Sequence, residues 1–134
     1  MSFEESKRVA LEWIKLVNDG NYDALRTFAA PSTNWWLSGL TSKASMAGDA
    51  TYASRIDTLE SFRTAFKSFE LVTRDVVVEG NTVILENEVT AMSHDGRVYR
   101  NNAMVKLRIE EGKIKDIREY VDLLAVFEFM GASV

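Results

Sequence analysis

The chain has 134 residues, enough for one domain with a continuous hydrophobic core. Hydrophobic residues make up 46% and charged residues 27%, as is typical of a soluble globular protein. The net charge of −4 without a basic cluster argues against nucleic-acid binding, and no apolar run is long enough to cross a bilayer. The absence of cysteine excludes disulfides and thiolate chemistry. We therefore expect a single domain over residues 1–134, without nucleic-acid or membrane partners and with a cytoplasmic location by default.

The first third of the chain has the 3.6-residue periodicity of helices. Ser2 and Glu5 form a capping box, in which each side chain accepts a hydrogen bond from the other residue's backbone N–H. The apolar residues that follow share one helix face: Val9, Ala10, Trp13, Ile14, Leu16 and Val17. Residues 18–21 end this helix, because Gly20 and the flanking asparagines tolerate left-handed backbone conformations.

Two further helices are predicted before the periodicity changes. Residues 22–29 form a short helix that ends before Pro31, the only proline of the chain. A third helix begins at Asp57, with Glu60 as its capping partner. Its apolar face consists of Leu59, Phe62, Ala65, Phe66 and Phe69.

From about Leu71 the apolar residues alternate with a period of two, which predicts strands. The expected strands are residues 72–79, 82–92, 98–109 and 114–122. The dipeptides between them, Gly80-Asn81, Asp95-Gly96 and Glu111-Gly112, are typical of hairpin turns. A short helix over residues 123–130 follows, with Gly131 at its end. Helices followed by an antiparallel meander predict an α+β domain, in which the helices pack on one face of a curved sheet.

Residues 33–55 interrupt this pattern, because they are rich in Ser, Thr, Ala and Gly yet contain large apolar side chains. Long irregular segments in compact domains are usually functional lids or disordered. Two interpretations stay open: a loop over the mouth of a cavity, or a partly ordered surface excursion. Asn34 and Trp36 are candidates for the mouth of a cavity, although Trp35 and Trp36 could equally be ordinary core residues.

The last predicted strand carries Glu119 on the same face as Ile117 and Val121. A carboxylate among apolar residues is either solvated at a sheet edge or held in a pocket, where loss of hydration raises its pKa. In a pocket, Glu119 could transfer protons near the working pH. The alternative is an ion pair with a neighbouring Arg or Lys across the sheet.

The preceding strand places Tyr99 and Asn101 on one face with Ala103, Val105 and Leu107. Tyr99 could donate a hydrogen bond to a developing oxyanion, or it could be an amphipathic strand residue anchored by its hydroxyl group. Asn101 could orient a substrate or act as an internal strut, because a buried amide must find partners.

Glu86 and Glu88 share a face of the second predicted strand. A second pocket carboxylate would couple with Glu119 and raise one of the two pKa values, but glutamates on a solvated face are common and we favour that interpretation. The only histidine, His94, lies in a predicted turn. With one histidine, no cysteine and no spaced carboxylate loop, no metal site is expected.

The order of elements and the last hairpin resemble the nuclear transport factor 2-like superfamily, and its SnoaL-like group in particular. Gly112-Lys113-Ile114 and Arg118-Glu119-Tyr120-Val121-Asp122 are similar to the common ending of that group. Tyr99-Arg100-Asn101 is similar to a Tyr-Arg-Asn sequence on the preceding strand of phenazine-biosynthesis relatives. The resemblance implies a cone-shaped fold, in which three N-terminal helices pack on a curved, mainly antiparallel sheet and enclose a pocket, usually in a homodimer.

Members of this group include polyketide cyclases, ketosteroid isomerase-like enzymes, limonene epoxide hydrolase and dehydratases, so the fold alone does not give the chemistry. The resemblance implies that Glu119 points into the pocket as an acid or base and that Tyr99 assists it. Limonene epoxide hydrolase needs an Arg-x-Asp sequence where this chain has Glu88 and Thr90, so that activity is not expected. The catalytic histidine of other members has no counterpart.

The expectation is therefore a cofactor-independent cyclase, isomerase or dehydratase that acts on a hydrophobic cyclic or polyketide-like molecule. Glu119 would transfer the proton, with the help of Tyr99. The expected ligand-binding residues are Asn34, Trp36, Glu88, Asn101, Ala103, Ile117 and Val121. The first alternative is a non-catalytic protein that binds a small hydrophobic ligand in the same pocket, and the second is a structural dimerisation module with no cavity.

Overall fold

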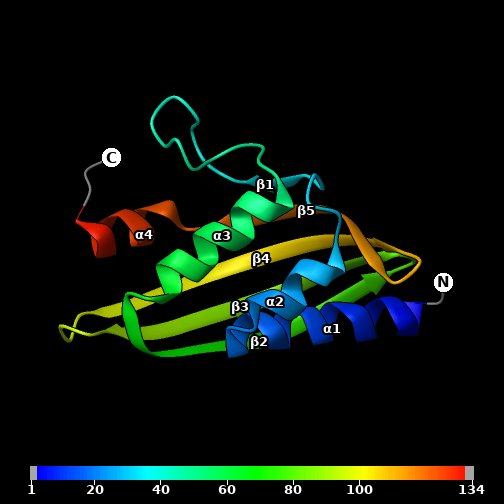
Figure 1. Cartoon of the computed structure of the whole chain (residues 1–134), viewed down its shortest axis with the longest axis horizontal. Helices are drawn as coiled ribbons and strands as arrows, with labels where there is room; N and C mark the ends of the chain where they lie inside the picture. The colour runs from blue at the N-terminus through cyan, green and yellow to red at the C-terminus, as the bar shows by residue number, and fades with distance from the viewer. Residues whose placement is uncertain (1–2, 132–134) are drawn as a thin grey trace.

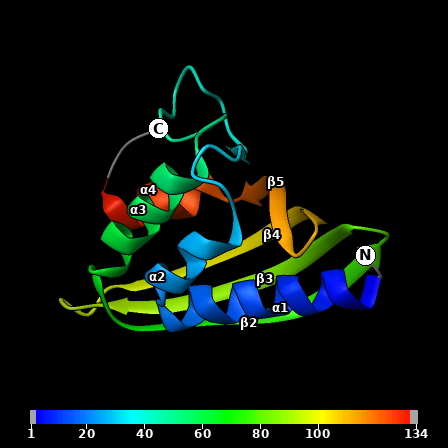
Figure 2. The same cartoon turned by 45° about the vertical axis from the view of Figure 1, so that its right-hand side comes forward.

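The computed structural model describes residues 3–131, which form four α-helices, one 3₁₀-helix and five strands. Their order is α1 (Phe3–Asp19), α2 (Tyr22–Leu25), η1 (Arg26–Phe28), β1 (Trp35–Leu37), α3 (Tyr52–Arg63), β2 (Phe66–Glu79), β3 (Thr82–Ser93), β4 (Val98–Glu110), β5 (Lys113–Val121) and α4 (Leu123–Met130). The strands form one sheet in the order β1-β5-β4-β3-β2, in which only the β1–β5 pair is parallel among the described residues. Helices α1, α2 and α3 cover one face of the curved sheet, and α4 lies beside β4 (Figures 1 and 2). The expected α+β fold is confirmed.

Helix α1 packs against the sheet through the apolar face that the sequence predicts, and Figure 2 shows it running along β2. Val9, Ala10, Trp13 and Ile14 are all buried, with exposed fractions of 6% or less. The burial of these four side chains fixes the helix over the sheet, because each fully buried large apolar side chain contributes about 1.5–3 kcal/mol. The Ser2 half of the expected capping box lies outside the described residues.

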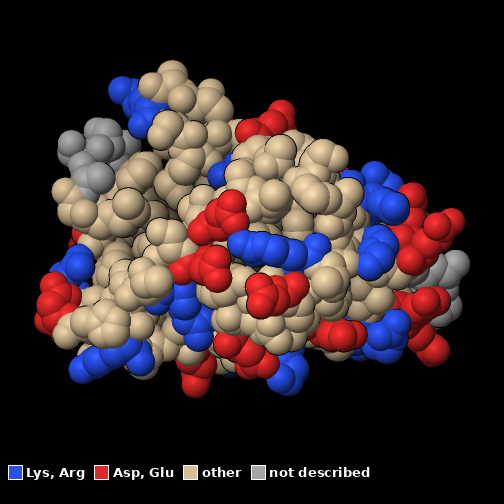
Figure 3. All heavy atoms as spheres, viewed as in Figure 1, with Lys and Arg blue, Asp and Glu red and all other residues tan. Residues whose placement is uncertain are grey.

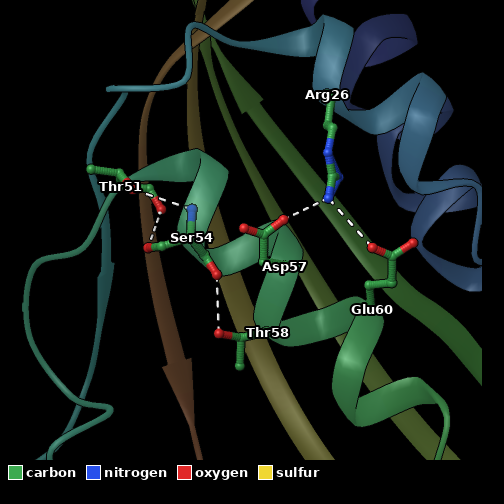
Figure 4. Close-up of polar contacts among 6 residues, drawn as sticks. All are labelled: Arg26, Thr51, Ser54, Asp57, Thr58 and Glu60. Atoms are coloured by element: carbon green, nitrogen blue, oxygen red, sulfur yellow. Dashed lines mark hydrogen bonds and ion pairs between the residues drawn. The ribbon is translucent and has the colours of Figure 1, made fainter.

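Helix α3 begins at Tyr52, five residues before the predicted start at Asp57, which corrects that boundary. The Thr51 hydroxyl caps the helix by accepting a hydrogen bond from the Ser54 backbone N–H at 3.2 Å. Asp57 instead lies within the helix, where it and Glu60 form ion pairs with Arg26 of η1 (Figure 4). Two acidic residues one turn apart resemble a cap in the sequence, but their partner is a cation on a neighbouring helix.

Phe66 and Phe69 belong to β2 and not to the third helix, which corrects a second expectation. Helix α3 ends at Arg63, and the chain turns into the strand within two residues. The spacing of the phenylalanines fits a helix face, but packing against the rest of the protein decides the conformation. The Phe66 ring stacks on Phe129 of α4, with centroids 5.0 Å apart, and lies edge-on to Phe62 at the same distance.

The segment 33–55 contains a strand that the sequence does not predict. Trp35 pairs with Ile117 and Leu37 pairs with Glu119, so β1 is added to the edge of the sheet parallel to β5. Residues 38–51 then project from the sheet as a loop before α3 begins (Figure 1). Three residues are too few to show a period of two, and their pairing partner lies far along the chain. Local sequence therefore carried no signal for β1.

The last hairpin has the tight turn that its sequence predicts. Glu111 and Gly112 both adopt positive φ angles, of 52° and 75°, as a two-residue hairpin loop requires. The turn pairs Ile109 with Ile114, and one extra residue in β5 after Ile114 then shifts the register, so that Glu119 lies opposite Val105. The inner face of β5 consequently carries Ile117, Glu119 and Val121.

The helix-covered side of the molecule carries acidic and basic side chains interspersed, without a large patch of one sign (Figure 3). The absence of nucleic-acid binding stays a prediction from the net charge. None of the helices among residues 3–131 is long and apolar enough to cross a membrane.

Candidate active site

Two neighbouring spaces lie between the helices and the inner face of the sheet. The inner cavity has a volume of about 130 Å³ and lies between α1, α3 and strands β2–β5. The outer groove, of about 550 Å³, lies between α3, α4 and β1. Both spaces are lined by Trp35, Leu59, Phe62, Tyr99, Glu119 and Val121. These shared residues mark the junction between the inner cavity and the outer groove.

Glu119 is the only carboxylate among the described residues that line the inner cavity. It lies deep in the protein, yet part of its side chain stays accessible at the junction. Its Oε1 accepts a hydrogen bond from Trp35 Nε1 at 3.0 Å, and the parallel pairing of β1 with β5 brings the two side chains together. Burial raises the pKa of Glu119, while the Trp35 hydrogen bond and the charge of Arg55 partly offset this rise.

Arg55 of α3 acts on Glu119 through its charge and not through an ion pair. Its guanidinium group donates hydrogen bonds to three backbone carbonyls, at 3.1 Å to Trp35 and at 2.7 Å to Met46 and Gly48. Burial lowers the pKa of Arg55, and the charge of Glu119 counteracts this. Arg55 therefore fixes β1 and the following loop on the outer groove, and it leaves the Glu119 carboxylate without a direct cation among the described residues.

Tyr99 and Asn101 form a hydrogen-bonded pair on the inner face of β4. The Asn101 amide nitrogen donates to the Tyr99 hydroxyl at 2.7 Å and to the backbone carbonyl of Asp122 at 3.0 Å. The Tyr99 hydroxyl thus accepts one hydrogen bond and keeps its own proton for a ligand. Burial raises the pKa of Tyr99, the Asn101 hydrogen bond lowers it, and the charges of Glu119 and Asp122 raise it further. The hydroxyl is consequently a hydrogen-bond donor at neutral pH.

The structure brings together five of the residues that the sequence singled out. Glu119, Tyr99, Asn101, Ala103 and Val121 all line the inner cavity, and their roles there stay predictions. The expectation that Tyr99 and Asn101 share a face is confirmed by their direct hydrogen bond.

Four other expected ligand-binding residues lie elsewhere. Trp36 faces the outer side of the sheet, where its ring packs edge-on against Tyr120 and beneath the Arg118 guanidinium group. Asn34 donates to the Asp49 carboxylate at 2.9 Å and lines neither space. Ile117 points inward but is fully buried in the core.

Glu88 is the fourth, and it lies on the outer face of β3 in an ion pair with Arg74 at 2.8 Å. The period of two was correct for β3, but the sequence did not show which of its two faces is inward. The structure shows that Glu86 and Glu88 face outward, which agrees with the solvated-face interpretation for the pair and corrects the assignment of Glu88 to the ligand site.

Three residues of the site were missed by the sequence analysis: Trp35, Arg55 and Asn87. Trp35 and Arg55 owe their positions to β1 and to the early start of α3, which local patterns do not reveal. Asn87 did have a signal, because it is the one polar residue in the alternating row of Val83, Leu85, Val89 and Ala91. A polar residue within an apolar face of a strand is a candidate for a ligand contact.

Metal ligation finds no support among residues 3–131, in which no cluster of three His, Cys, Asp or Glu side chains is suited to a metal ion. His94 lies exposed in the β3–β4 turn, and its Nε2 lies 3.1 Å from the Thr64 carbonyl oxygen.

The sequence of residues 10–117 matches the SnoaL-like domain family. The chain belongs to this family. No curated protein matches the sequence. The match covers the helices and strands that enclose the inner cavity, except for the residues of α1 before residue 10 and the residues of β5 after residue 117, which include Glu119.

Solved structures with the same fold are distant in sequence. AclR from Streptomyces galilaeus is 17% identical, with a TM-score of 0.80 over 97% of this chain and 83% of that one. A protein from Jannaschia Sp. CCS1 assigned to the SnoaL-like polyketide cyclases is 17% identical, with a TM-score of 0.77 over 98% and 94%. A nuclear transport factor 2-like protein from Burkholderia xenovorans LB400 is 19% identical, with a TM-score of 0.71 over 96% and 97%. At such identities the likeness shows the nuclear transport factor 2-like fold alone.

Proposed function

We propose that this SnoaL-like protein is a cofactor-independent enzyme that transfers a proton on a hydrophobic cyclic or polyketide-like substrate. The observation that supports this most is the position of Glu119 at the junction of the inner cavity and the outer groove. Apolar walls raise its pKa, and one oxygen is held by Trp35 while the other has no partner among the described residues. A carboxylate whose pKa lies above the ordinary glutamate value is suited to act as a general base.

The proposed reaction begins at the carbon next to a substrate carbonyl. The free oxygen of Glu119 takes a proton from this carbon, the C–H electron pair becomes a C=C bond, and the carbonyl oxygen takes up the negative charge. Tyr99 donates its hydroxyl proton in a hydrogen bond to that oxygen, which lowers the barrier in a cavity lined mainly by apolar side chains. Asn101 positions Tyr99.

Three outcomes are open to the enolate. Return of the proton from Glu119 to another carbon gives an isomerase. Attack of the enolate carbon on a second carbonyl group of the same molecule, whose oxygen then takes the proton from Glu119, gives a cyclase. Loss of a hydroxyl group from the neighbouring carbon, as water formed with the proton from Glu119, gives a dehydratase. All three use the same first proton transfer, so Glu119 has the same role in each.

A second candidate function is non-catalytic binding of a small hydrophobic ligand in the same cavity. Glu119 is the only carboxylate among the described lining residues of the inner cavity. The cavity therefore has no second carboxylate to act as the partner acid or base, and this favours binding without catalysis. The two functions differ in what a Glu119→Gln substitution does to the bound molecule.

The test is to incubate the protein with a mixed pool of aromatic and polyketide-like ketones in D₂O and to recover bound compounds by mass spectrometry. The enzyme hypothesis predicts that wild type turns over a recovered compound or exchanges its protons beside the carbonyl for deuterium, whereas Glu119→Gln binds it without either. Binding to both forms, with no turnover or exchange in either, would support the carrier function instead.

We also propose that the protein is a homodimer formed through the outer face of the sheet. Met104 and Tyr120 lie on this face opposite one another in the β4–β5 pairing, and their exposed fractions are 47% and 49%. Trp36 packs against Tyr120 and extends this apolar patch. A second copy of the chain would bury the patch in a symmetric contact.

A further inference from the structure

Asn87 is a polar side chain in the inner cavity that the proton transfer at Glu119 does not use. It lies on the inner face of β3, is 2% exposed and lines the inner cavity. Its Oδ1 accepts a hydrogen bond from the Thr73 hydroxyl at 2.9 Å. No partner for its Nδ2 exists among residues 3–131.

The free Nδ2 must reach the open space of the cavity. Every side-chain nitrogen and oxygen atom that is fully shielded within residues 3–131 has a hydrogen-bond partner. Since the Asn87 Nδ2 has none, it is not fully shielded, and the space beside Asn87 is the inner cavity. A buried donor that is left unpaired costs free energy, so an acceptor that enters the cavity is stabilised there.

Asn87 and Glu119 face the cavity from different strands of the sheet. The strand register places Asn87 opposite Ala103, and Ala103 opposite Val121, which is two residues from Glu119. With strands about 4.8 Å apart and a rise of about 3.3 Å per residue, the Cα atoms of Asn87 and Glu119 are roughly 12 Å apart. A molecule in the cavity can therefore contact both groups at two separate positions.

The size of the inner cavity limits what can enter. Its volume of about 130 Å³ is close to that of an engineered cavity of about 150 Å³ that binds benzene. The inner cavity thus accommodates about one six-membered ring, and the larger outer groove accommodates the remainder of a longer molecule.

We propose that the inner cavity receives one ring of the substrate, and that a carbonyl or ether oxygen on this ring accepts a hydrogen bond from the Asn87 Nδ2. This inference rests on the proposed use of the cavity as the substrate site. The substrate then carries two oxygen functions, one on the ring at Asn87 and one at the junction beside Glu119 and Tyr99. Asn87 selects oxygenated rings over hydrocarbon rings of the same shape.

The test uses two probes of nearly identical shape, acetophenone and α-methylstyrene, in which a carbonyl oxygen replaces a CH₂ group. Their dissociation constants are measured by ¹⁵N NMR, from the indole N–H signals of Trp13 and Trp35, which line the cavity. The ratio of the two constants is compared between wild type and Asn87→Leu, which keeps the branched shape of the side chain and removes the donor. We expect the preference for acetophenone to fall about fivefold in Asn87→Leu.

Two further variants separate loss of the donor from disturbance of the fold. Asn87→Asp keeps an acceptor for Thr73 but removes the Nδ2 donor, and we expect it to lose the preference as Asn87→Leu does. Thr73→Val removes the hydroxyl and leaves the donor, so it should keep the wild-type ratio within about twofold. In wild type, acetophenone should also shift the side-chain amide signal of Asn87 directly, a readout that needs no variant.

An unchanged ratio in a folded Asn87→Leu protein would overturn the proposal, as would an Asn87 amide signal that acetophenone does not move. Absence of saturable binding by both probes would overturn it too. Glu119→Gln should bind both probes with the wild-type ratio, because it leaves Asn87 intact. A failure of the proton-transfer hypothesis is thereby scored separately from a failure of the Asn87 assignment.

Discussion

The Glu119 carboxylate is held by one hydrogen bond, from Trp35, and by no ion pair among the described residues. Three features of its surroundings act on the pKa of Glu119: burial, the Trp35 hydrogen bond and the charge of Arg55. Burial in the apolar junction disfavours the charged form, whereas the indole donor and the charge of Arg55 favour it. Because burial is the largest of the three, ionisation of Glu119 in the folded protein costs stability.

The first prediction concerns Glu119→Gln and pH. Since the folded-state pKa of Glu119 lies above its unfolded value, the folded protein binds more protons in the pH range between the two values, and stability falls as pH rises through that range. The amide group introduced by the substitution carries no charge and keeps an oxygen for Trp35. We expect the substitution to increase the free energy of unfolding above the raised pKa, with a gain that fades as pH falls toward the ordinary value of 4.5.

Urea unfolding across this pH range measures the effect, with Glu86→Gln on the exposed outer face as the matched control. The control should change stability by no more than about 0.5 kcal/mol at any pH. A Glu119→Gln protein that is less stable than wild type at high pH would show that the carboxylate is stabilised and not strained by its surroundings.

The second prediction separates the hydroxyl group of Tyr99 from its ring. The ring packs against Phe62, Phe66 and Phe129, and Tyr99→Phe keeps these contacts. Loss of the acceptor for Asn101 should cost about 0.5–1.5 kcal/mol of stability, whereas loss of the donor to an oxyanion should reduce turnover of a recovered substrate by about 100-fold. Tyr120→Phe, on the outer face, is the control and should leave turnover unchanged. Wild-type turnover by Tyr99→Phe would remove Tyr99 from the reaction.

At the scale of elements, the site is built where β1 and α3 meet the last strand. Arg55 is the residue that joins them, because its three hydrogen bonds run to backbone carbonyls of β1 and of the loop that follows. Arg26 also attaches α3 to its surroundings, but through exposed ion pairs to Asp57 and Glu60 (Figure 4). Substitution of Arg55 should therefore reduce stability more than substitution of Arg26.

The third prediction compares Arg55→Gln with Arg26→Gln. Arg55→Gln removes the side-chain donor from three backbone carbonyls, of which the Gly48 carbonyl keeps the Leu37 N–H. We expect a loss of about 2 kcal/mol and faster amide hydrogen exchange at Leu37 and Gly48. Arg26→Gln removes only surface ion pairs, and we expect a loss below about 1 kcal/mol with unchanged exchange in the loop. Equal effects of the two substitutions would contradict the role given to Arg55.

At the scale of the whole molecule, the outer face of the sheet is the surface that the helices leave uncovered. The fourth prediction follows from its apolar patch: Met104→Glu should convert the proposed dimer to a monomer, because a symmetric contact would place two buried charges near each other. Light scattering gives the mass directly. Leu40→Glu is the control, because Leu40 is exposed on the projecting loop and not on the sheet. A wild-type protein that is already monomeric at high concentration would refute the dimer.

Much of the fold could be predicted from the sequence because its signals are local. The apolar face around Trp13, the hairpin turn at Gly112 and the alternation in β4 each report on residues close by in the chain. The predictions were wrong where contacts between residues far apart in the sequence determine the conformation. Phe66 and Phe69 have helical spacing but lie in a strand, and Trp35 reaches Glu119 only because β1 pairs with β5.

The same distinction explains the site. Tyr99, Asn101 and Glu119 share their faces with apolar residues, which indicate the inward side of their strands. Glu88 was placed on the wrong side because a period of two does not tell the inner face of a strand from its outer face. Asn87 is the polar residue on the inner face of that strand, and its chemistry depends on a cavity that only the packed structure reveals.

The role of Glu119 as a proton carrier depends on a carboxyl group that titrates above the ordinary glutamate range. The most direct measurement is a ¹³C NMR titration of protein labelled at the glutamate side-chain carboxyl groups, with Glu119→Gln to assign the signal. We predict one carboxyl signal that titrates well above 4.5 and is missing from the variant. A Glu119 signal that titrates at or below 4.5 would contradict the proposed proton transfer.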